Sequence, residues 1–439
     1  MAEAGTRVAE AGALSATSRL RNIVGGSAGN LVEWFDWYIY AAFTLYFAPS
    51  FFPKGDQTAQ LLSSAAVFAV GFVMRPIGAY VFGMYADRKG RKAGLTLSVS
   101  LMCGGSLMIA AAPTYASAGL LSPAILVLAR MIQGLSLGGE YGSSATYLSE
   151  MAGKERRGFW SSFQYVTLIA GQLVALALLL VMQATLREAE LERWGWRVAF
   201  LCGALLAVVV FFIRRRLSES PSFEAVPKSG KTSSGRSLFR EHPREALLVM
   251  ALTAGGTLAF YAYTTYMQKY LANTVGFDRV TASRIMTAAL FVFMVLQPLG
   301  GLLSDRFGRK PVMIAFGILG TLLTVPIFTA LEATRSPWSA FALVMASLVI
   351  VTGYTSINAV VKAELFPSHI RALGVALPYA IANTIFGGTA EYVALWLKDA
   401  GHERWFYYYV AGMIGLSLVA YATMRETRTS SRIDDDLVP

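Results

Sequence analysis

The chain has 439 residues, of which 55% are hydrophobic and only 15% are charged. Soluble domains carry about 25% charged residues, so this composition indicates lipid surroundings and excludes an ordinary soluble enzyme. The formal net charge of +11 does not indicate nucleic-acid binding, because the basic residues lie between apolar runs and form no continuous basic face.

The first 21 residues lack the apolar core of a signal peptide, and we expect them to form a cytoplasmic tail. A membrane-spanning helix needs about 20 mostly apolar residues. The runs that meet this requirement lie at 22–47, 61–85, 94–112, 123–148, 159–183, 196–213, 246–270, 281–303, 311–330, 337–362, 372–396 and 404–424. The sequence therefore predicts an all-α membrane protein with twelve transmembrane helices.

The longest connection, at 214–245, is polar, basic and rich in Ser, Pro and Gly. We expect it to be a cytoplasmic linker between one six-helix half at 22–213 and another at 246–424, with a cytoplasmic tail at 425–439. Lys and Arg are concentrated in the segments on the side of the amino terminus, and the positive-inside rule places that side in the cytoplasm.

The two halves repeat each other in their loops. GMYADRKGRK at 83–92 follows the second run, and GLLSDRFGRK at 301–310 follows the eighth. A glutamate also follows the fourth run and the tenth. Two copies in the same orientation require a two-fold axis along the membrane normal. The repeated positions are Asp87, Arg91 and Glu150 in the first half, and Asp305, Arg309 and Glu364 in the second.

The repeated loop resembles the hallmark of the major facilitator superfamily, and three further segments resemble its metabolite–proton symporters. These segments are GNLVEWFD at 29–36, MRPIG at 74–78 and RMIQGLSLGGEYG at 130–142. Within these symporters the chain is most similar to α-ketoglutarate carriers, on the segments 163–169, 264–270, 286–293 and 386–393. The resemblance implies the major facilitator fold and alternating access.

Glu33, Asp36, Arg75 and Arg130 fall at comparable depth inside predicted spans of the first half, where an ionised side chain costs about 2.5–3.5 kcal/mol on insertion scales. Arg75 and Arg130 are candidates for substrate binding, because a guanidinium binds a carboxylate with two parallel hydrogen bonds. Glu33 and Asp36 are candidates for proton coupling, because the three histidines fall in or beside loops. The alternative is a structural ion-pair network.

Other charged residues also lie inside predicted spans. Glu140 is either a proton site or a buried structural partner. Lys269 can supply a second cation for a dicarboxylate, with Glu391 as its partner or gate, or it can snorkel to the outer interface. Lys362 lies at the cytoplasmic end of the tenth run, where we expect it to snorkel.

Uncharged polar residues in the central spans either contact substrate or hydrogen-bond neighbouring helices. Among them Gln164 and Tyr38 are our candidates for substrate contacts. The others are Tyr165, Gln172, Tyr261, Tyr266, Asn358, Tyr379 and Asn383.

The family resemblance implies that the acidic and basic residues of the repeated loops latch the outward-open state. The alternative is that the positive charges of these loops only set the orientation of the helices in the membrane. The expected function is proton-coupled import of α-ketoglutarate or a similar dicarboxylate across the bacterial inner membrane. Alternatives are symport of citrate, shikimate or a zwitterionic osmolyte. We expect a lipid-embedded monomer without catalytic residues, cofactor, metal or nucleic-acid partner, because the sequence has no nucleophile–base set, metal-ligand cluster or phosphate-binding loop.

Overall fold

The computed structural model describes residues 16–53, 55–89, 91–215 and 235–435. Within these ranges it leaves out the side chains of 16–29, 83–96, 140, 143–144, 147, 150–151, 213–215, 237, 368–369 and 435. The described chain is helical apart from short connections and contains no strand, in agreement with the predicted all-α fold.

Six long helical paths form the first half of the chain. They are α2 (Ala16–Phe51), α3 (Gln57–Lys89), α4 (Arg91–Ala111), α6 (Leu121–Gly138) continued by α7 (Glu140–Met151), α8 (Arg157–Ser161) continued by α9 (Phe163–Thr185), and α11 (Trp196–Arg215). Short elements connect them: α5 (Tyr115–Ala118), the turn Lys154–Arg156, α10 (Glu188–Glu190) and the π-helical turn Leu191–Gly195.

The second half repeats this order. Its first path is α14 (Pro243–Tyr261), the π-helical turn η3 (Ala262–Tyr266), α15 (Met267–Tyr270) and a second such turn, Leu271–Val275. Next come α16 (Arg279–Phe307), α17 (Arg309–Ala333) and α18 (Pro337–Thr355) continued by α19 (Asn358–Glu364). The last are α20 (Ser368–Ala382), η5 (Asn383–Gly387) and α21 (Ala390–Asp399), then α22 (Arg404–Thr423); α13 (Gly235–Glu241) and α23 (Arg432–Asp435) are short.

The described helices agree with twelve membrane crossings. Ten helical stretches are long and apolar enough to span a bilayer, and α2 and α4 supply the remaining two paths. Four predicted spans are interrupted by turn residues: 123–148 at Gly139, 159–183 at Ser162, 337–362 at Ser356–Ile357 and 372–396 at Gly388–Thr389. Ile357 leaves helical geometry, with φ −129° and ψ −5°. A new helix, α19, begins directly after Ile357, and the consequence for Lys362 is described below.

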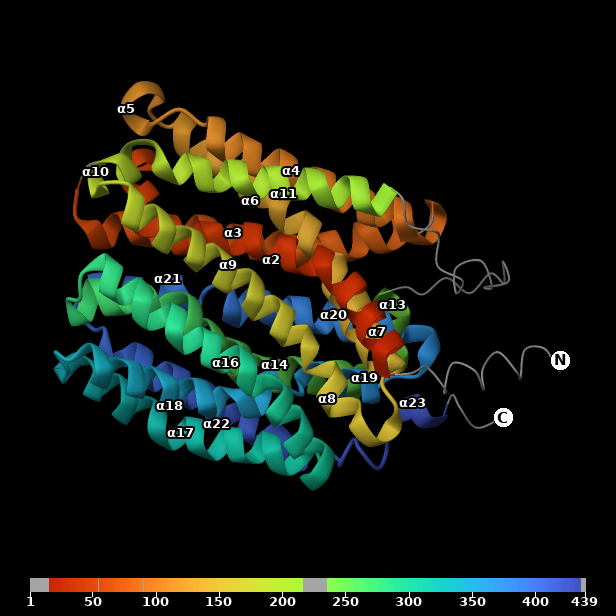
Figure 1. Cartoon of the computed structure of the whole chain (residues 1–439). Helices are drawn as coiled ribbons and strands as arrows, with labels where there is room; N and C mark the ends of the chain where they lie inside the picture. The colour runs from red at the N-terminus through yellow and green to blue at the C-terminus, as the bar shows by residue number, and fades with distance from the viewer. Residues whose placement is uncertain (1–15, 54, 90, 216–234, 436–439) are drawn as a thin grey trace.

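The two halves lie side by side and contact each other along their length (Figure 1). Helix α9 packs against α2 of its own half and against α16 of the other half. Helix α3 contacts α20 and α21, and α7 contacts α19 and α20. The helices α7, α8, α13, α19 and α23 gather at one end of the bundle, which we call the terminal end (Figure 1).

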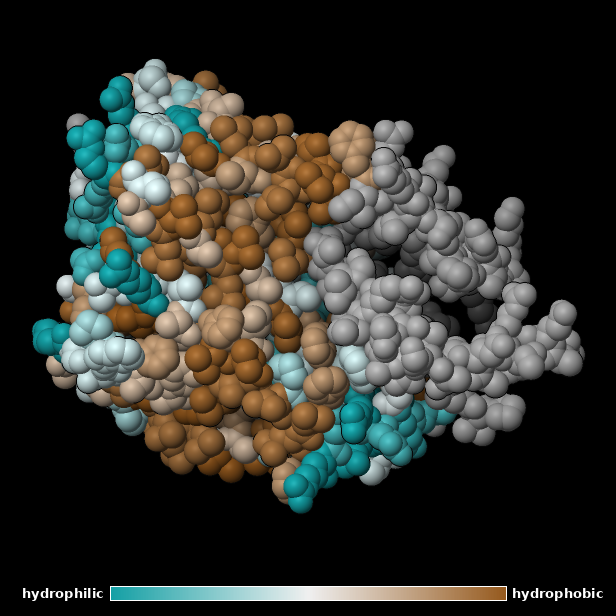
Figure 2. Space-filling model, viewed as in Figure 1, coloured by the Kyte–Doolittle hydropathy of each residue, from teal (hydrophilic) through white to brown (hydrophobic). Residues whose placement is uncertain are grey.

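The outer surface is apolar where lipid would contact it. Figure 2 shows a broad hydrophobic band with hydrophilic residues at its edges. Large apolar side chains such as Leu205 and Leu322 are 65% and 64% exposed. Trp338 and Trp405, at the ends of α18 and α22 away from the terminal end, are 82% and 66% exposed, as expected for an interfacial aromatic belt. The polar residues discussed next lie inside.

Candidate functional site

Four charged side chains from three helices of the first half are buried together. Glu33 and Asp36 of α2 are 1% and 0% exposed, Arg75 of α3 is 4% exposed, and Arg130 of α6 is fully buried. Helices α3 and α6 approach closely because glycine faces backbone: a Cβ at Gly138 would overlap the carbonyl of Arg75. The small residues thus let α3 and α6 pack closely, and this brings the two arginines near each other.

Arg75 is held by aromatic rings rather than by a carboxylate. Its guanidinium carbon lies 3.9 Å from the ring centre of Phe72, 4.3 Å from that of Trp37 and 5.4 Å from that of Trp34. Such cation–π contacts orient a guanidinium without using its N–H groups. In the described part of the chain, Nε and Nη2 of Arg75 have no hydrogen-bond partner. These donors are therefore open to an anion.

Arg130 shares the ring of Trp37 with Arg75. Its guanidinium carbon lies 3.8 Å from the centre of that ring and 4.4 Å from the centre of Tyr40. Nη1 donates to Oε1 of Gln133 at 2.9 Å. Among the described residues nothing accepts from its Nε and Nη2. The indole of Trp37 thus contacts two buried cations from different helices.

Asp36 contacts Arg130 through a bridging amide and not directly. Nε2 of Gln133 donates to Oδ2 of Asp36 at 2.8 Å, while Ser106 of α4 donates to Oδ1. Glu33, one turn earlier, accepts from Ser98 at 3.4 Å. Because Ser106 and Gln133 are neutral donors, Asp36 can gain or lose a proton without breaking a salt bridge to a described residue. Sequence reasoning missed Gln133, although its i, i+3 spacing from Arg130 is a usable signal.

Polar side chains from both halves meet beside Arg75. Tyr261 of the second half packs edge-to-face on Phe72, with ring centroids 5.2 Å apart, and Phe72 contacts the guanidinium of Arg75. Tyr38 and Tyr379 also interact electrostatically with this guanidinium. The π-helical turn η3 begins directly after Tyr261, and the π-helical turn η5 begins at Asn383. Such turns are frequent at functional sites. Within the described ranges, the hydroxyls of Tyr38 and Tyr354 and Nδ2 of Asn383 are buried without a partner.

Gln164 is also fully buried, on α9. A small cavity lies farther along α9, and it is bounded by residues of both halves. The lining residues are Tyr38, Ala41, Ala42, Gln172, Leu176, Thr264, Thr265, Gln268 and Met286.

The two predicted charges of the outer second half form a pair. Nζ of Lys269 donates to Oε2 of Glu391 at 2.7 Å, and the two residues are 1% and 4% exposed. Lys269 therefore does not snorkel. The expectation that Lys362 snorkels is also wrong, because Lys362 is fully buried. The helix break at Ser356–Ile357 turns α19 so that this lysine lies between the halves.

At the terminal end, the side chain of Asp305 on α16 forms hydrogen bonds with the first half. Its two carboxylate oxygens accept from the backbone N–H groups of Gly158 and Phe159 at 2.8 Å each. Arg309 donates to Asp305 at 2.7 Å. Gly308 adopts φ +101°, a left-handed value that favours glycine, and this allows α17 to start at once and return Arg309 to Asp305.

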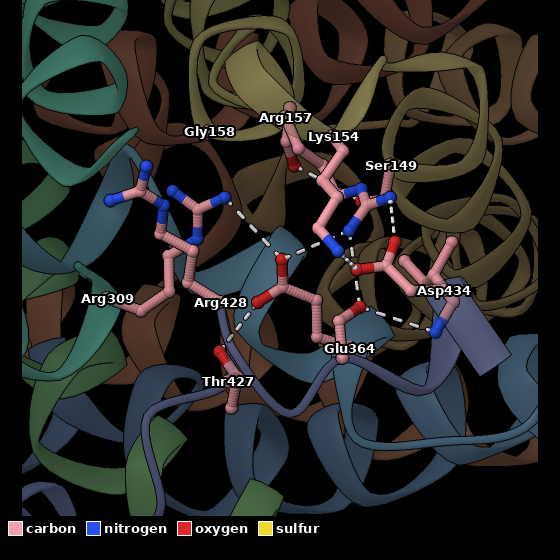
Figure 3. Close-up of polar contacts among 12 residues, drawn as sticks. Ser149, Lys154, Arg157, Gly158, Arg309, Glu364, Thr427, Arg428 and Asp434 are labelled. Atoms are coloured by element: carbon pink, nitrogen blue, oxygen red, sulfur yellow. Dashed lines mark hydrogen bonds and ion pairs between the residues drawn. The ribbon is translucent and has the colours of Figure 1, made fainter. Parts of the chain in front are cut away.

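Glu364 lies at the centre of the same cluster (Figure 3). Its Oε1 is 3.5 Å from Nη2 of Arg309 and 3.7 Å from Nη1 of Arg157, which belongs to the first half. Thr427 donates to its Oε2 at 2.6 Å. Asp305, Arg309 and Glu364, predicted to cluster, therefore lie together. Sequence reasoning did not include Arg157 in the cluster.

The carboxy-terminal segment also joins this cluster. Asp434 of α23 pairs with Nη2 of Arg157 at 2.8 Å and with Lys154 at 3.0 Å (Figure 3). Partial burial raises the pKa of the Asp434 carboxyl, but hydrogen bonds from these two cations outweigh burial and lower the pKa below its ordinary value. Asp434 is therefore ionised at neutral pH. Glu426 accepts from the backbone N–H groups of Arg309 and Lys310.

Contacts between the halves also close the opposite end. Arg279 of α16 is 2.6 Å from Glu192 and 3.1 Å from Glu188 of the first half. Nε2 of Gln183 donates to Tyr46 at 2.7 Å and to Ser283 of the second half at 3.3 Å. The central polar residues are thus enclosed by inter-half contacts at both ends.

For four predicted site residues the structure describes the backbone but not the side chain. The side chains of Glu140, Asp87, Arg91 and Glu150 lie outside the described residues. Their backbone positions fall in α7, α3, α4 and α7 respectively.

Replacing Asp305 with asparagine is expected to loosen the terminal end. The change removes the charge from two hydrogen bonds to backbone N–H groups, and hydrogen bonds to charged groups contribute about 1.5–3 kcal/mol each. We expect amide hydrogen exchange at Gly158 and Phe159 to accelerate by about 10-fold or more, as measured by mass spectrometry of the purified protein.

Asp278→Asn is the matched control for this exchange measurement. Asp278 caps the other end of α16 and accepts from the backbone N–H groups of Val280 and Thr281. This variant should accelerate amide exchange at Val280 and Thr281 and leave exchange at Gly158 and Phe159 unchanged. If Asp305→Asn also leaves those two amides unchanged, the carboxylate does not hold the two halves together.

Comparisons with known proteins agree with this architecture. A family model described as Major Facilitator Superfamily matches residues 27–372 and 257–436. The α-ketoglutarate permease of Escherichia coli (strain K12) is 55% identical over 90% of this chain and 91% of that protein. A citrate-proton symporter of Klebsiella pneumoniae is 32% identical over 84% of both chains. The solved proton:xylose symporter bound to 6-bromo-6-deoxy-D-glucose superposes with a TM-score of 0.78 at 17% identity, covering 97% of this chain and 99% of that chain.

Proposed function

Because the chain belongs to the major facilitator superfamily, we propose that it imports α-ketoglutarate, or a similar short dicarboxylate, together with protons. The protein is a multi-pass membrane transporter and not an enzyme. The observation that carries the proposed substrate class is the buried guanidinium of Arg75. It lies at the interface of the halves, and two of its N–H-bearing nitrogens have no hydrogen-bond partner among the described residues.

Arg75 and Arg130 bind carboxylate in this proposal. The rings of Phe72 and Trp37 fix the guanidinium of Arg75 from the side, so that its free N–H groups need little reorganisation when an anion arrives. Tyr38 and Gln164 offer uncharged hydrogen bonds from the first half. Lys269 acts from the outer part of the second half, with Glu391 as its gating partner.

Asp36 is our first choice for the proton-binding group, with Glu33 and Glu140 as the other candidates. Near neutral pH a dicarboxylate is a dianion, and a negative-inside membrane opposes its entry by about 2.3 kcal/mol per charge per 100 mV. Co-transported protons remove this penalty. Because Gln133 joins Asp36 to Arg130, a change of charge on Asp36 alters the field at the arginine and hence the affinity for the anion.

Alternating access follows from the two sets of inter-half contacts. We place the terminal end in the cytoplasm of a bacterial cell, with both termini on that side of the inner membrane. Breaking the cluster of Asp305, Arg309 and Glu364 opens the cytoplasmic side, and breaking the contacts of Arg279 opens the outer side. Asp87, Arg91 and Glu150 take the equivalent part in the first-half repeat. The transporter acts as a monomer in lipid and needs no cofactor, metal or nucleic acid.

The test uses purified protein in proteoliposomes with an imposed pH gradient. We expect labelled α-ketoglutarate to accumulate when the outside is acidic, and excess unlabelled α-ketoglutarate to compete better than citrate, shikimate or glycine betaine. Accumulation that ignores the pH gradient would contradict proton symport. Stronger competition by one of the other solutes would assign the protein to that substrate instead.

A further inference from the structure

Lys362 is a buried cation at the interface of the two halves. It lies on α19 and is fully buried. Its Nζ donates to Oδ1 of Asn358 at 2.8 Å. The same nitrogen lies 4.0 Å from the ring centre of Tyr379 and 5.6 Å from that of Tyr141, which belongs to the first half. An ammonium group can donate three hydrogen bonds, and here an amide oxygen and aromatic faces surround it.

No described carboxylate lies within ion-pair distance of this ammonium group. The contrast with two other buried cations of the second half is clear. Lys269 is 2.7 Å from Glu391, and Arg309 is 2.7 Å from Asp305. A buried charge without a counter-ion is costly, and buried charges are normally paired. Lys362 therefore resembles Arg75, which also lacks a direct counter-ion among the described residues.

Tyrosine side chains connect the surroundings of these two cations. Tyr379 is in contact with Lys362 and also lies within the electrostatic range of Arg75. Its ring stacks on Tyr141 of the first half, with centroids 3.9 Å apart and planes at 13°. Tyr261, also of the second half, lies within the range of Arg75. Tyr379 thus interacts with one buried cation from each half, and neither cation has a counter-ion among the described residues.

We propose that Lys362 binds the distal carboxylate of a dicarboxylate whose keto-acid end is bound by Arg75. This assignment rests on the proposed function and adds the group that selects for a second negative charge. The substrate then contacts both halves: the first half binds one carboxylate and the second half binds the other. Lys269 is less suited to this role, because Glu391 already neutralises it at 2.7 Å.

The assignment also explains why Lys362 is enclosed by tyrosines. Hydroxyl groups such as that of Tyr354, which is buried and has no partner in the described part of the chain, can donate to an incoming anion. The substrate must displace little protein–protein bonding to reach the ammonium group, because among the described residues its one hydrogen bond is to Asn358. A monocarboxylate leaves this cation without a counter-ion and therefore binds weakly.

The experiment compares α-ketoglutarate with 2-oxopentanoate, which has a methyl group in place of the distal carboxylate. Binding of both acids to the purified full-length protein is measured by calorimetry for the wild type and for Lys362→Met. In the variant, affinity for α-ketoglutarate should fall by about 30-fold or more, the lower end for truncating a buried charge pair, while affinity for 2-oxopentanoate stays the same. Lys362→Arg should retain part of the preference for the dianion.

Lys398→Met is the matched control, because Lys398 donates to the backbone of Asn273 and to Thr274 away from this region. It should preserve the preference for α-ketoglutarate. If Lys362→Met is as stable to heat as the wild type and also keeps the preference, Lys362 does not read the distal carboxylate. Loss of the preference in Lys269→Met alone would transfer the role to Lys269. Failure of the wild type to bind α-ketoglutarate would instead overturn the proposed function.

Discussion

Arg75→Gln is expected to abolish concentrative uptake of α-ketoglutarate. Truncating one partner of a buried, hydrogen-bonded charge pair costs about 2–5 kcal/mol, which corresponds to about 30-fold to several thousand-fold in affinity. Glutamine retains a donor but loses the charge and the fork of the guanidinium, and it no longer stacks as a cation on Phe72 and Trp37. The measurement is initial uptake by proteoliposomes, together with substrate binding in detergent.

Two further variants separate substrate binding from folding. Arg75→Lys keeps the charge without the planar fork and should recover only a small part of the uptake. Arg335→Gln should transport normally, because Arg335 is exposed and donates only to nearby backbone carbonyls. Normal uptake by Arg75→Gln would show that the buried guanidinium is a structural group and that the anion binds elsewhere.

Asp36→Asn should uncouple substrate movement from the pH gradient. The side chain is fully buried, and asparagine keeps its shape while removing the group that exchanges a proton. We expect no accumulation under a pH gradient, while exchange of external for internal α-ketoglutarate stays within about 10-fold of the wild type, equivalent to a change of about 1.4 kcal/mol in the barrier. Parallel gradient-driven and exchange assays on the same vesicles measure both rates.

Glu33→Gln is the discriminating partner of this experiment. If Glu33 is only a structural acceptor for Ser98, this variant still accumulates substrate when the outside is acidic. Gradient-driven accumulation by Asp36→Asn, combined with its loss in Glu33→Gln, would assign the proton to Glu33. Loss of both exchange and accumulation in Asp36→Asn would mean that Asp36 positions Gln133 and Arg130 and does not carry the proton.

The sequence was sufficient to predict the membrane crossings, because the length of an apolar run and the bilayer thickness are directly linked. It also indicated that Arg75, Arg130 and the α2 acids belong to one buried group, since charges at similar depth on neighbouring spans attract each other. It did not reveal that Gln133 lies between Arg130 and Asp36. An arginine and a carboxylate on neighbouring helices give the same sequence pattern whether they pair directly or through a bridging amide.

Lys362 shows where hydropathy reasoning fails. An unbroken helix over 337–362 places this lysine at the membrane edge, where its long side chain would reach water. The chain instead breaks at Ser356–Ile357, and α19 carries Lys362 inward onto Tyr379. Neither Ser nor Ile is a helix breaker on the scale of Pro or Gly. Helix α19 packs against α7 and α8 of the other half, and a single sequence does not display such contacts.

The contact between Arg157 and Asp434 has a consequence for biosynthesis. It joins residues 277 positions apart in the chain. Asp434 emerges from the ribosome only after all the spanning helices have been translated. The cluster around Glu364 therefore lacks one of its anchors until all these helices have been synthesised, and the nascent halves can adjust their packing before Asp434 pairs with Arg157.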